Sequence, residues 1–528
     1  MKKLFILFTF IAVLLVGLAA CDNNEASNNN ANTDDTTSTA ANNNDSGSDS
    51  LDVLEIFINF PWFPIDHFEG IIPDAIREAT GVDLNITIAT DPAQLGLMIA
   101  SGDLPDLVWT QYDLHRLSDS RVTMSYDDLV TYHGAHFDDV TEEAMAIGRN
   151  FSSDGSLYVI LNYFNNAEEW SNLQVGAPGQ AMMAYRRDLL EAIGIDGSAI
   201  SSVDELLDVL IDVRDAYPNH IPFGLGGFWQ FQGIGNALGV PGARFNPTTG
   251  EYNFITTTPQ YRELLEIANR MYREGLISIE HYANENEGVS HQFAFNDEVV
   301  FYNWWLSYAD YRQLYTETRN IHPEAEWAIL PFLGDEGYTN FHSGWSGVFV
   351  SRNVSNPEAA ARLLSFLHSE EGRRLSMWGR EGTEFTMGDN GVPQFSDEFI
   401  ERRSAGEMNS VYNTLFHFGG STIHTIYRNV SGIDPDILAA ITTHGVGFQT
   451  FPEVTVAQPQ PSSNEGVTLA LLNEINRVHE PLVIFASTDE EFEQAYEAFM
   501  AALEEAGLRD FNAYMTEAIR ETRERLGW

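Results

Sequence analysis

The architecture of this chain follows from four short pieces of sequence, LDVLEIFINF (51–60), IIPDAIRE (71–78), VDLNITI (82–88) and LVW (107–109). The first is typical of a buried strand, the second of a short helix stopped by Gly81, and the third of a strand with alternating apolar and polar residues. Residues 91–101 predict another helix, which ends at Gly102, before the third strand at 107–109. A β-α-β-α-β order is typical of a parallel sheet covered by helices, so we predict an α/β fold.

Further along the chain, cap residues mark the starts of helices. Ser202 and Glu205 match a capping box, and Thr488 and Glu491 have the same spacing. Thr258-Pro259 and Asn356-Pro357 each predict a helix that begins at the proline. Strands are expected near 182–185, 299–304 and 348–350. We find no internal repeat.

The first 21 residues have the pattern of a secretory signal. Lysines at 2 and 3 precede an apolar run over 4–16, and the segment closes on LAAC at 18–21. The run is too short and too abruptly stopped for a membrane-spanning helix, so we interpret it as a cleaved export signal rather than a signal anchor. Cys21 is the only cysteine, and its place after two alanines matches a lipobox. Two or three acyl chains such as palmitate on Cys21 would hold the protein on the extracytoplasmic face of the cell membrane, anchored but not embedded.

Residues 22–50 consist almost wholly of small and polar side chains, with no aromatic residue. Such a segment cannot bury enough apolar surface to fold, so we interpret it as a disordered tether. A flexible coil of this length spans roughly 30 Å on average. The body, residues 51–528, is too long for a single core and predicts two or three lobes.

The charge of the chain is strongly negative. The two lysines leave with the signal, so the remaining 26 basic residues are all arginines, against 77 acidic residues. We therefore expect no binding to nucleic acid and none to an anionic membrane by the body, because both need basic patches. The lack of lysine fits adaptation to an alkaline or saline exterior, since arginine stays charged where lysine titrates, and it fits mutational bias equally well.

No complete catalytic motif is found. Residues 344–348 read GWSGV, one glycine short of a nucleophile elbow, and there is no phosphate-binding loop. His133 and His136 lie beside two aspartates, a pattern that is more often incidental than a metal site. A pair of glycosidase carboxylates is neither identified nor excluded, because acidic pairs occur throughout the chain. We assign no catalytic residue, no metal and no cofactor.

Tryptophans beside amides and hydroxyls are the strongest indication of a binding site. They follow predicted strands or lie in glycine-rich loops, where ligands bind in open α/β sheets. Flat aromatic rings stack on the apolar faces of sugar rings, and planar amides hydrogen-bond sugar hydroxyls. Any one of these tryptophans fits core packing about as well, but the set favours a ligand site. The predicted ligand-binding residues are Asn59, Trp62, Trp109, Gln111, Trp229, Trp304, Trp305 and Trp345, with Gln230, Asn303 and Ser343 nearby.

Several motifs of the body resemble a known family. They are ASGDLPD (100–106), DGSLY (154–158), YRRDLL (185–190) with Gly194, TP (258–259) through YREGLI (272–277), NPEAA (356–360) through GREG (379–382), and the run from Phe492 through GL (507–508) to AY (513–514). The chain resembles the extracellular solute-binding proteins, family 1, of ATP-driven sugar importers, in particular the large lipoprotein branch that includes oligosaccharide and alginate binders. The calcium loop of the alginate binders has no clear counterpart here.

The resemblance implies a two-lobed type II periplasmic-binding-protein fold with hinge-linked lobes. We place lobe 1 at residues 51–181 with a return at 348–400, lobe 2 at 182–347, and the segment 401–528 mainly with lobe 2. The expected crossings lie near 182–185 and 344–350. Ligand would be captured as the lobes close.

The function expected from these features is a monomeric, non-enzymatic, lipid-anchored receptor that delivers an oligosaccharide to an ABC permease. Two alternatives stay open at this point. A surface glycoside hydrolase would need two positioned carboxylates, and a peptide-binding receptor would use the same fold. The sequence does not identify the sugar.

Overall fold

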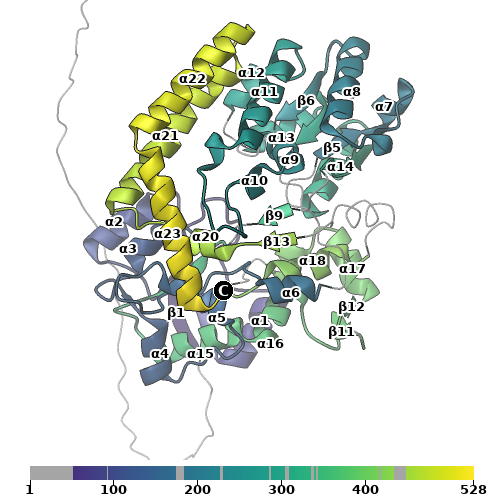
Figure 1. Cartoon of the computed structure of the whole chain (residues 1–528). Helices are drawn as coiled ribbons and strands as arrows, with labels where there is room; N and C mark the ends of the chain where they lie inside the picture. The colour runs from purple at the N-terminus through teal and green to yellow at the C-terminus, as the bar shows by residue number, and fades with distance from the viewer. Residues whose placement is uncertain are drawn as a thin grey trace, which may run out of the picture. The chain divides into compact units, whose positions relative to one another are not determined.

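The computed structural model describes residues 51–528, apart from 92, 174–182, 226–229, 285–286, 304–307, 335–337, 341–342, 390, 415–417 and 433–447 (Figure 1). The described residues belong to the unit Ser50–Trp528. The expectations for the signal and the tether at residues 1–50 lie outside them. None of the described helices is long and apolar enough to cross a membrane.

The first sheet has five strands in the order β2-β1-β3-β10-β4. Its parallel part consists of β1 (Asp52–Ile58), β2 (Val82–Ile88) and β3 (Leu107–Thr110). These strands are joined by α1 (Ile71–Thr80) and α2 (Gln94–Ser101), so the predicted β-α-β-α-β order is confirmed. Strand β10 (Gly347–Ser351) runs antiparallel between β3 and β4 (Thr123–Met124).

Both faces of the first sheet are buried. Alternate residues of each strand point to opposite sides, and residues on each side belong to a hydrophobic core. Leu54, Ile56 and Ile58 of β1 belong to a core that includes residues of α1, α15 (Pro357–His368) and α16 (Glu370–Trp378). Phe57 of β1 lies in a second core with Val108 and Phe349. Burial on both faces is what a sheet with helical cover requires.

The second sheet has four strands in the order β6-β7-β5-β8. Its strands are β5 (Met183–Arg186), β6 (Ile221–Leu225), β7 (Val299–Asn303) and β8 (Trp327–Ile329). Strands β6 and β7 are parallel, and β5 is antiparallel to β7 and β8. Besides β1, β2 and β3, the two sheets contain six strands, and three of these, β5, β7 and β10, lie where the sequence predicted them.

The predicted helix starts are also found. They belong to α8 (Val203–Ala216), α11 (Pro259–Arg273), α15 and α22 (Asp489–Glu505), and the hydroxyl or amide oxygen of each cap residue accepts a backbone N–H. One detail differs from the prediction at both capping boxes. The Glu491 carboxylate accepts the N–H of Ser487 at 2.9 Å rather than that of Thr488. The Glu205 carboxylate accepts the N–H and hydroxyl of Ser201, at 2.8 Å each, rather than the N–H of Ser202, so the reciprocal half of that capping box does not form.

The segment after residue 396 contributes to both cores. Phe399, Tyr412 and Phe418 are buried with the first sheet, whereas Phe499, Phe511 and Ile519 are buried with the second. The second group lies on α22 and α23 (Leu508–Leu526), which pack with α21 (Asn464–Ile484) (Figure 1).

The remaining elements are shorter and connect or cover the two sheets. The helices are α3 (Leu114–Leu117), α4 (Tyr126–His133), α5 (Glu142–Arg149), α6 (Ala167–Ser171), α7 (Arg187–Ala192), α9 (Gln232–Ala237), α10 (Val240–Ala243), α12 (Ile279–Ala283), α13 (Glu287–Phe295), α14 (Tyr308–Ile321), α17 (Asp397–Ser404), α18 (Thr422–Val430) and α20 (Pro452–Val456). Two strand pairs, β9 (Tyr338–Asn340) with β13 (Phe448–Thr450) and β11 (Phe385–Met387) with β12 (Pro393–Phe395), complete the set.

Candidate ligand-binding site

The candidate site lies at one edge of the first sheet. Parallel strands β1 and β3 end at this edge, and β10 begins there, because Gly347 pairs with Thr110. The residues that follow β1 and β3 and those that precede β10 are therefore brought together. Ligands of open α/β sheets bind at such carboxyl ends of strands.

Three stacked aromatic rings form what we name the aromatic platform (Phe60, Trp62 and Trp345), in which Phe60 is buried. The Trp345 ring is stacked on Phe60, with centroids 5.0 Å apart and planes 26° apart. Trp62 is stacked on Trp345 at 6.0 Å and 29°. Trp62 is 57% exposed and Trp345 partly buried. The platform thus offers a flat apolar surface to the solvent.

Trp109 lies beneath the platform and is fully buried. Its ring meets Phe60, Phe63, Trp345 and Phe418 edge-on, with centroids 4.9 to 6.0 Å apart. Its indole N–H donates to Ser346 Oγ at 2.9 Å. Since Trp109 exposes no surface, its role in this arrangement is to support the rings above it.

Trp345 is held in place through both its side chain and its backbone. The indole N–H donates to Gln111 Oε1 at 2.6 Å. The backbone N–H of Trp345 donates to the Asn162 carbonyl at 2.9 Å, and Asn162 returns an N–H to the Ser346 carbonyl at 2.8 Å. Gly344 allows this close approach: its φ is +109°, and a Cβ there would lie 2.5 Å from Leu161 Cβ.

Tyr163 forms a side wall of the platform and has an unusual backbone. Its φ is 60°, which is rare for a bulky residue. Its ring meets Trp345 edge-on at 6.0 Å, and burial raises the pKa of its hydroxyl. Hydrogen bonds hold the backbone, because its N–H donates to the Gly420 carbonyl and its carbonyl accepts the Thr422 hydroxyl, both at 2.7 Å. Strained residues of this kind concentrate at functional sites.

Asn59 directly follows β1, and its side chain has a polar atom without a partner among the described residues. The side chain is fully buried, and its amide Nδ2 donates to Thr110 Oγ1 at 3.2 Å. Its Oδ1 has no hydrogen-bond partner among the described residues. A buried acceptor without a partner is costly, so Asn59 has an unmet hydrogen-bonding capacity next to the platform.

The structure brings five of the predicted residues to this edge, namely Asn59, Trp62, Trp109, Gln111 and Trp345. Trp229, Trp304 and Trp305 lie outside the described residues. In the second sheet, Asn303 accepts the Gly233 N–H at 2.9 Å and donates to the Gln230 carbonyl at 2.5 Å, so it positions the turn after β6. Ser343 is buried, at 7% exposure.

The sequence reasoning missed Phe60, Asn162 and Tyr163. Phe60 follows the predicted residue Asn59, but it was assigned to the buried strand at 51–60 and so was not considered as a ligand-binding residue. Nothing in the sequence marks Asn162 or Tyr163, because their importance comes from contacts with a segment some 180 residues later in the chain.

The side chains that resemble catalytic or metal-binding groups have structural contacts. Ser346 is fully buried, and its hydroxyl accepts from Trp109 and lies 3.2 Å from Asn162 Oδ1. His133 Nδ1 lies 3.0 Å from Glu358 Oε1. Among the described residues, no three His, Cys, Asp or Glu side chains are grouped so that they could hold a metal ion.

Comparison with known proteins finds similarity to solved structures but none to protein families or curated sequences. No known protein family matches the sequence, and no curated protein matches it. Among solved structures, an alginate-binding protein without calcium ion superposes with a TM-score of 0.64 at 16% identity, covering 90% of this chain and 99% of that one.

Two structures from Streptococcus pneumoniae are similar to the same extent. The ABC-transporter substrate-binding protein FusA, in complex with kestose, has a TM-score of 0.62 at 16% identity and covers 90% of this chain and 100% of that one. The N-glycan transport solute-binding protein NgtS has a TM-score of 0.58 at 13% identity, with coverages of 90% and 99%. At such identities the likeness concerns the fold, and it confirms that this chain has the α/β fold of periplasmic solute-binding proteins.

Proposed function

We propose that this protein is a receptor that binds a neutral oligosaccharide on the aromatic platform and delivers it to an ABC importer. The observation that carries the proposal is the stack of Trp62 on Trp345, exposed at the carboxyl ends of β1 and β3. The similar folds of ABC-transporter and N-glycan transport proteins support it.

The platform has the two features that sugar recognition requires. Trp62 offers an exposed ring face against which the C–H face of a pyranose packs. The side-chain amide of Gln111 lies beside the platform, where it can hydrogen-bond the hydroxyls of a sugar. Because an indole N–H can only donate, Oε1 is the Gln111 atom that Trp345 engages, and the Gln111 NH₂ is directed elsewhere.

The charge of the chain favours an uncharged ligand. The 77 acidic residues outnumber the basic ones almost threefold, so an anionic polymer is repelled by the body as a whole. The rings of the platform and the side chains of Gln111 and Asn162 are uncharged. Hydroxyl groups are thus the polar groups that the platform is suited to bind.

Capture by closure of two lobes is part of the proposal. Lobe 1, residues 51–181 and 348–400, would provide Phe60 and Trp62 of the platform, and Trp345 would lie on the return crossing at 344–350. Lobe 2, residues 182–347 with most of 401–528, would cover the ligand from the other side. A ligand that touches both lobes stabilises the closed state by its extra contacts there, and a membrane permease would then recognise that state. We propose a monomer for this role.

The last part of the proposed function is a lipid anchor. Cys21 would carry the acyl chains, and residues 22–50 would tether the body to the extracytoplasmic face of the membrane. Cys21→Ser removes the thiol, so the protein should leave the membrane fraction for the soluble fraction. Equal partition of parent and variant with membranes would contradict the anchor.

Incubation with neutral oligosaccharides tests the receptor function itself. We expect saturable binding in isothermal titration calorimetry, and intact sugar in the mixture by mass spectrometry after hours of incubation. Shortened sugars would instead indicate a glycoside hydrolase. Displacement of the sugar by peptides would indicate a peptide receptor.

A further inference from the structure

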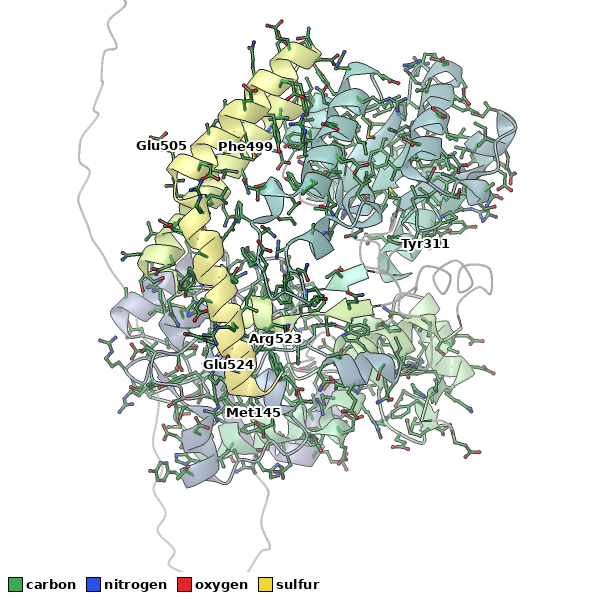
Figure 2. All side chains as sticks on the ribbon, viewed as in Figure 1. Met145, Tyr311, Phe499, Glu505, Arg523 and Glu524 are labelled. Atoms are coloured by element: carbon green, nitrogen blue, oxygen red, sulfur yellow. The ribbon has the colours of Figure 1, made fainter. Side chains whose placement is uncertain are left out.

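A second cavity lies away from the aromatic platform and shares no residue with it. It has a volume of about 730 Å³ and is bounded by α5, the loop 150–155, Gln460 and the end of α23. Figure 2 shows the region from which these walls come, with Met145 of α5 close to the end of α23 that bears Arg523 and Glu524. Cavities of roughly 300 to 1,000 Å³ are of the size that holds small ligands.

One wall of this cavity is an anchored aromatic ring. Trp528 is partly buried and packs against the core that contains Phe57, Val108 and Phe349. Trp528 also lines the cavity. Because the core holds one side of the ring, Trp528 is positioned to stack with a ligand on the other side.

The floor is a loop with a fixed backbone. Arg149 donates to both carboxylate oxygens of Asp127 at 2.7 Å and to the Gly155 carbonyl at 3.1 Å. Gln460 Nε2 donates to the Asn150 carbonyl at 3.2 Å and ties the two walls together. The hydroxyl of Ser153 is exposed on this loop.

Acidic and basic side chains both line the cavity. The Arg149 charge is matched by Asp127, with which it forms an ion pair. Two exposed groups remain, the guanidinium of Arg525 and the carboxylate of Glu142. The side chains that line the cavity therefore carry charges of both signs, although the chain carries about fifty net negative charges.

We propose that this cavity binds a neutral saccharide of one or two units, stacked on Trp528. An anion would face Glu142 and a cation would face Arg525, whereas sugar hydroxyls accept from the guanidinium and donate to the carboxylate. An apolar ligand would bury both charges without partners, which is costly. This site is independent of the receptor function proposed above.

Two substitutions test the site. Trp528→Ala removes the stacking ring, and Ser153→Trp fills the cavity from an exposed position without touching the core. The probes are maltose, cellobiose and N,N′-diacetylchitobiose at millimolar concentration, titrated into the full-length protein. We expect one of them to bind here, with affinity at least ~10-fold weaker in both variants and unchanged in Trp62→Ala.

The outcomes separate the two sites. Binding that Trp62→Ala abolishes and that neither Trp528→Ala nor Ser153→Trp alters would overturn this proposal and leave the platform standing. Binding that is lost only in Ser153→Trp and Trp528→Ala would support this site, independently of the platform. If Trp528→Ala does not fold, Ser153→Trp alone decides. Absence of binding by all three sugars in the parent would also overturn the site.

Discussion

Trp62 follows β1 and Trp109 lies near the end of β3, yet Trp62 is 57% exposed and Trp109 fully buried. The sequence predicts the placement of both, because strand ends can be read from local patterns. It does not predict the difference in burial. That difference comes from Phe418 and Ser346, which cover Trp109 from distant parts of the chain.

Tyr163 shows the same limit at the level of the backbone. A tyrosine with φ of 60° has no mark in the sequence, because this conformation is disfavoured for its type. It is imposed by hydrogen bonds to the segment that contains Gly420 and Thr422. Local propensity is overridden here by tertiary contacts.

His281 should make the protein sensitive to mild acid. It is 3% exposed and stacked on Phe293 at 3.8 Å, and burial lowers its pKa from 6.5 to about 4. Between these values the unfolded chain binds a proton that the folded chain does not. Stability therefore falls as pH decreases below 6.5, by roughly 1 to 2 kcal/mol at pH 5 from this group.

His281→Phe keeps the stacked ring and removes the titration. Urea unfolding at pH 7 and pH 5 should show a smaller loss of stability for the variant than for the parent, by that same amount. Equal losses in the two proteins would mean that His281 does not titrate as its burial indicates.

At the scale of elements, helix starts are the best-predicted features. Caps act over three or four residues, so Thr258-Pro259 and Asn356-Pro357 could be recognised directly. The order of strands could not. The position of β10 beside β3 joins residues more than 200 apart, and its antiparallel direction follows from the return of the chain to the first sheet.

Asn269 of α11 is expected to be the main link between α11 and the end of α21. Its side-chain NH₂ donates to the carbonyls of Val483, Ile484 and Ala486, at 3.4, 2.9 and 2.8 Å. Asn269→Ala leaves these buried acceptors without that donor, which should cost about 2 to 3 kcal/mol. Urea unfolding measures the change. The exposed Asn473→Ala on α21 serves as control and should change stability by less than about 0.5 kcal/mol; equal effects would refute the link.

At the scale of the whole molecule, the large net negative charge should make stability depend on salt. About fifty uncompensated negative charges repel one another, and salt screens that repulsion within roughly 3 Å at 1 M. The melting temperature should therefore rise from low salt to molar salt. It should change little from pH 7 to 9.5, because no lysine remains after the signal and arginine stays protonated.

Thermal melts across salt and pH distinguish the two explanations of this composition. A melting temperature that does not depend on salt, or that collapses by pH 9.5, would mean that the composition reflects mutational bias. A rise with salt would support adaptation to a saline or alkaline exterior.

Binding of a neutral oligosaccharide by the aromatic platform is the central claim, and Trp62→Ala tests it most directly. Trp62 is exposed, so its removal should leave the melting temperature nearly unchanged. Tyr132→Ala, at an aromatic side chain that is 72% exposed on α4, is the matched control. Calorimetric titration with the oligosaccharide that the parent binds should show affinity about 5- to 150-fold weaker for Trp62→Ala, from loss of about 1 to 3 kcal/mol of stacking and burial. The affinity should be unchanged for Tyr132→Ala. Equal affinities of parent and Trp62→Ala would contradict the account.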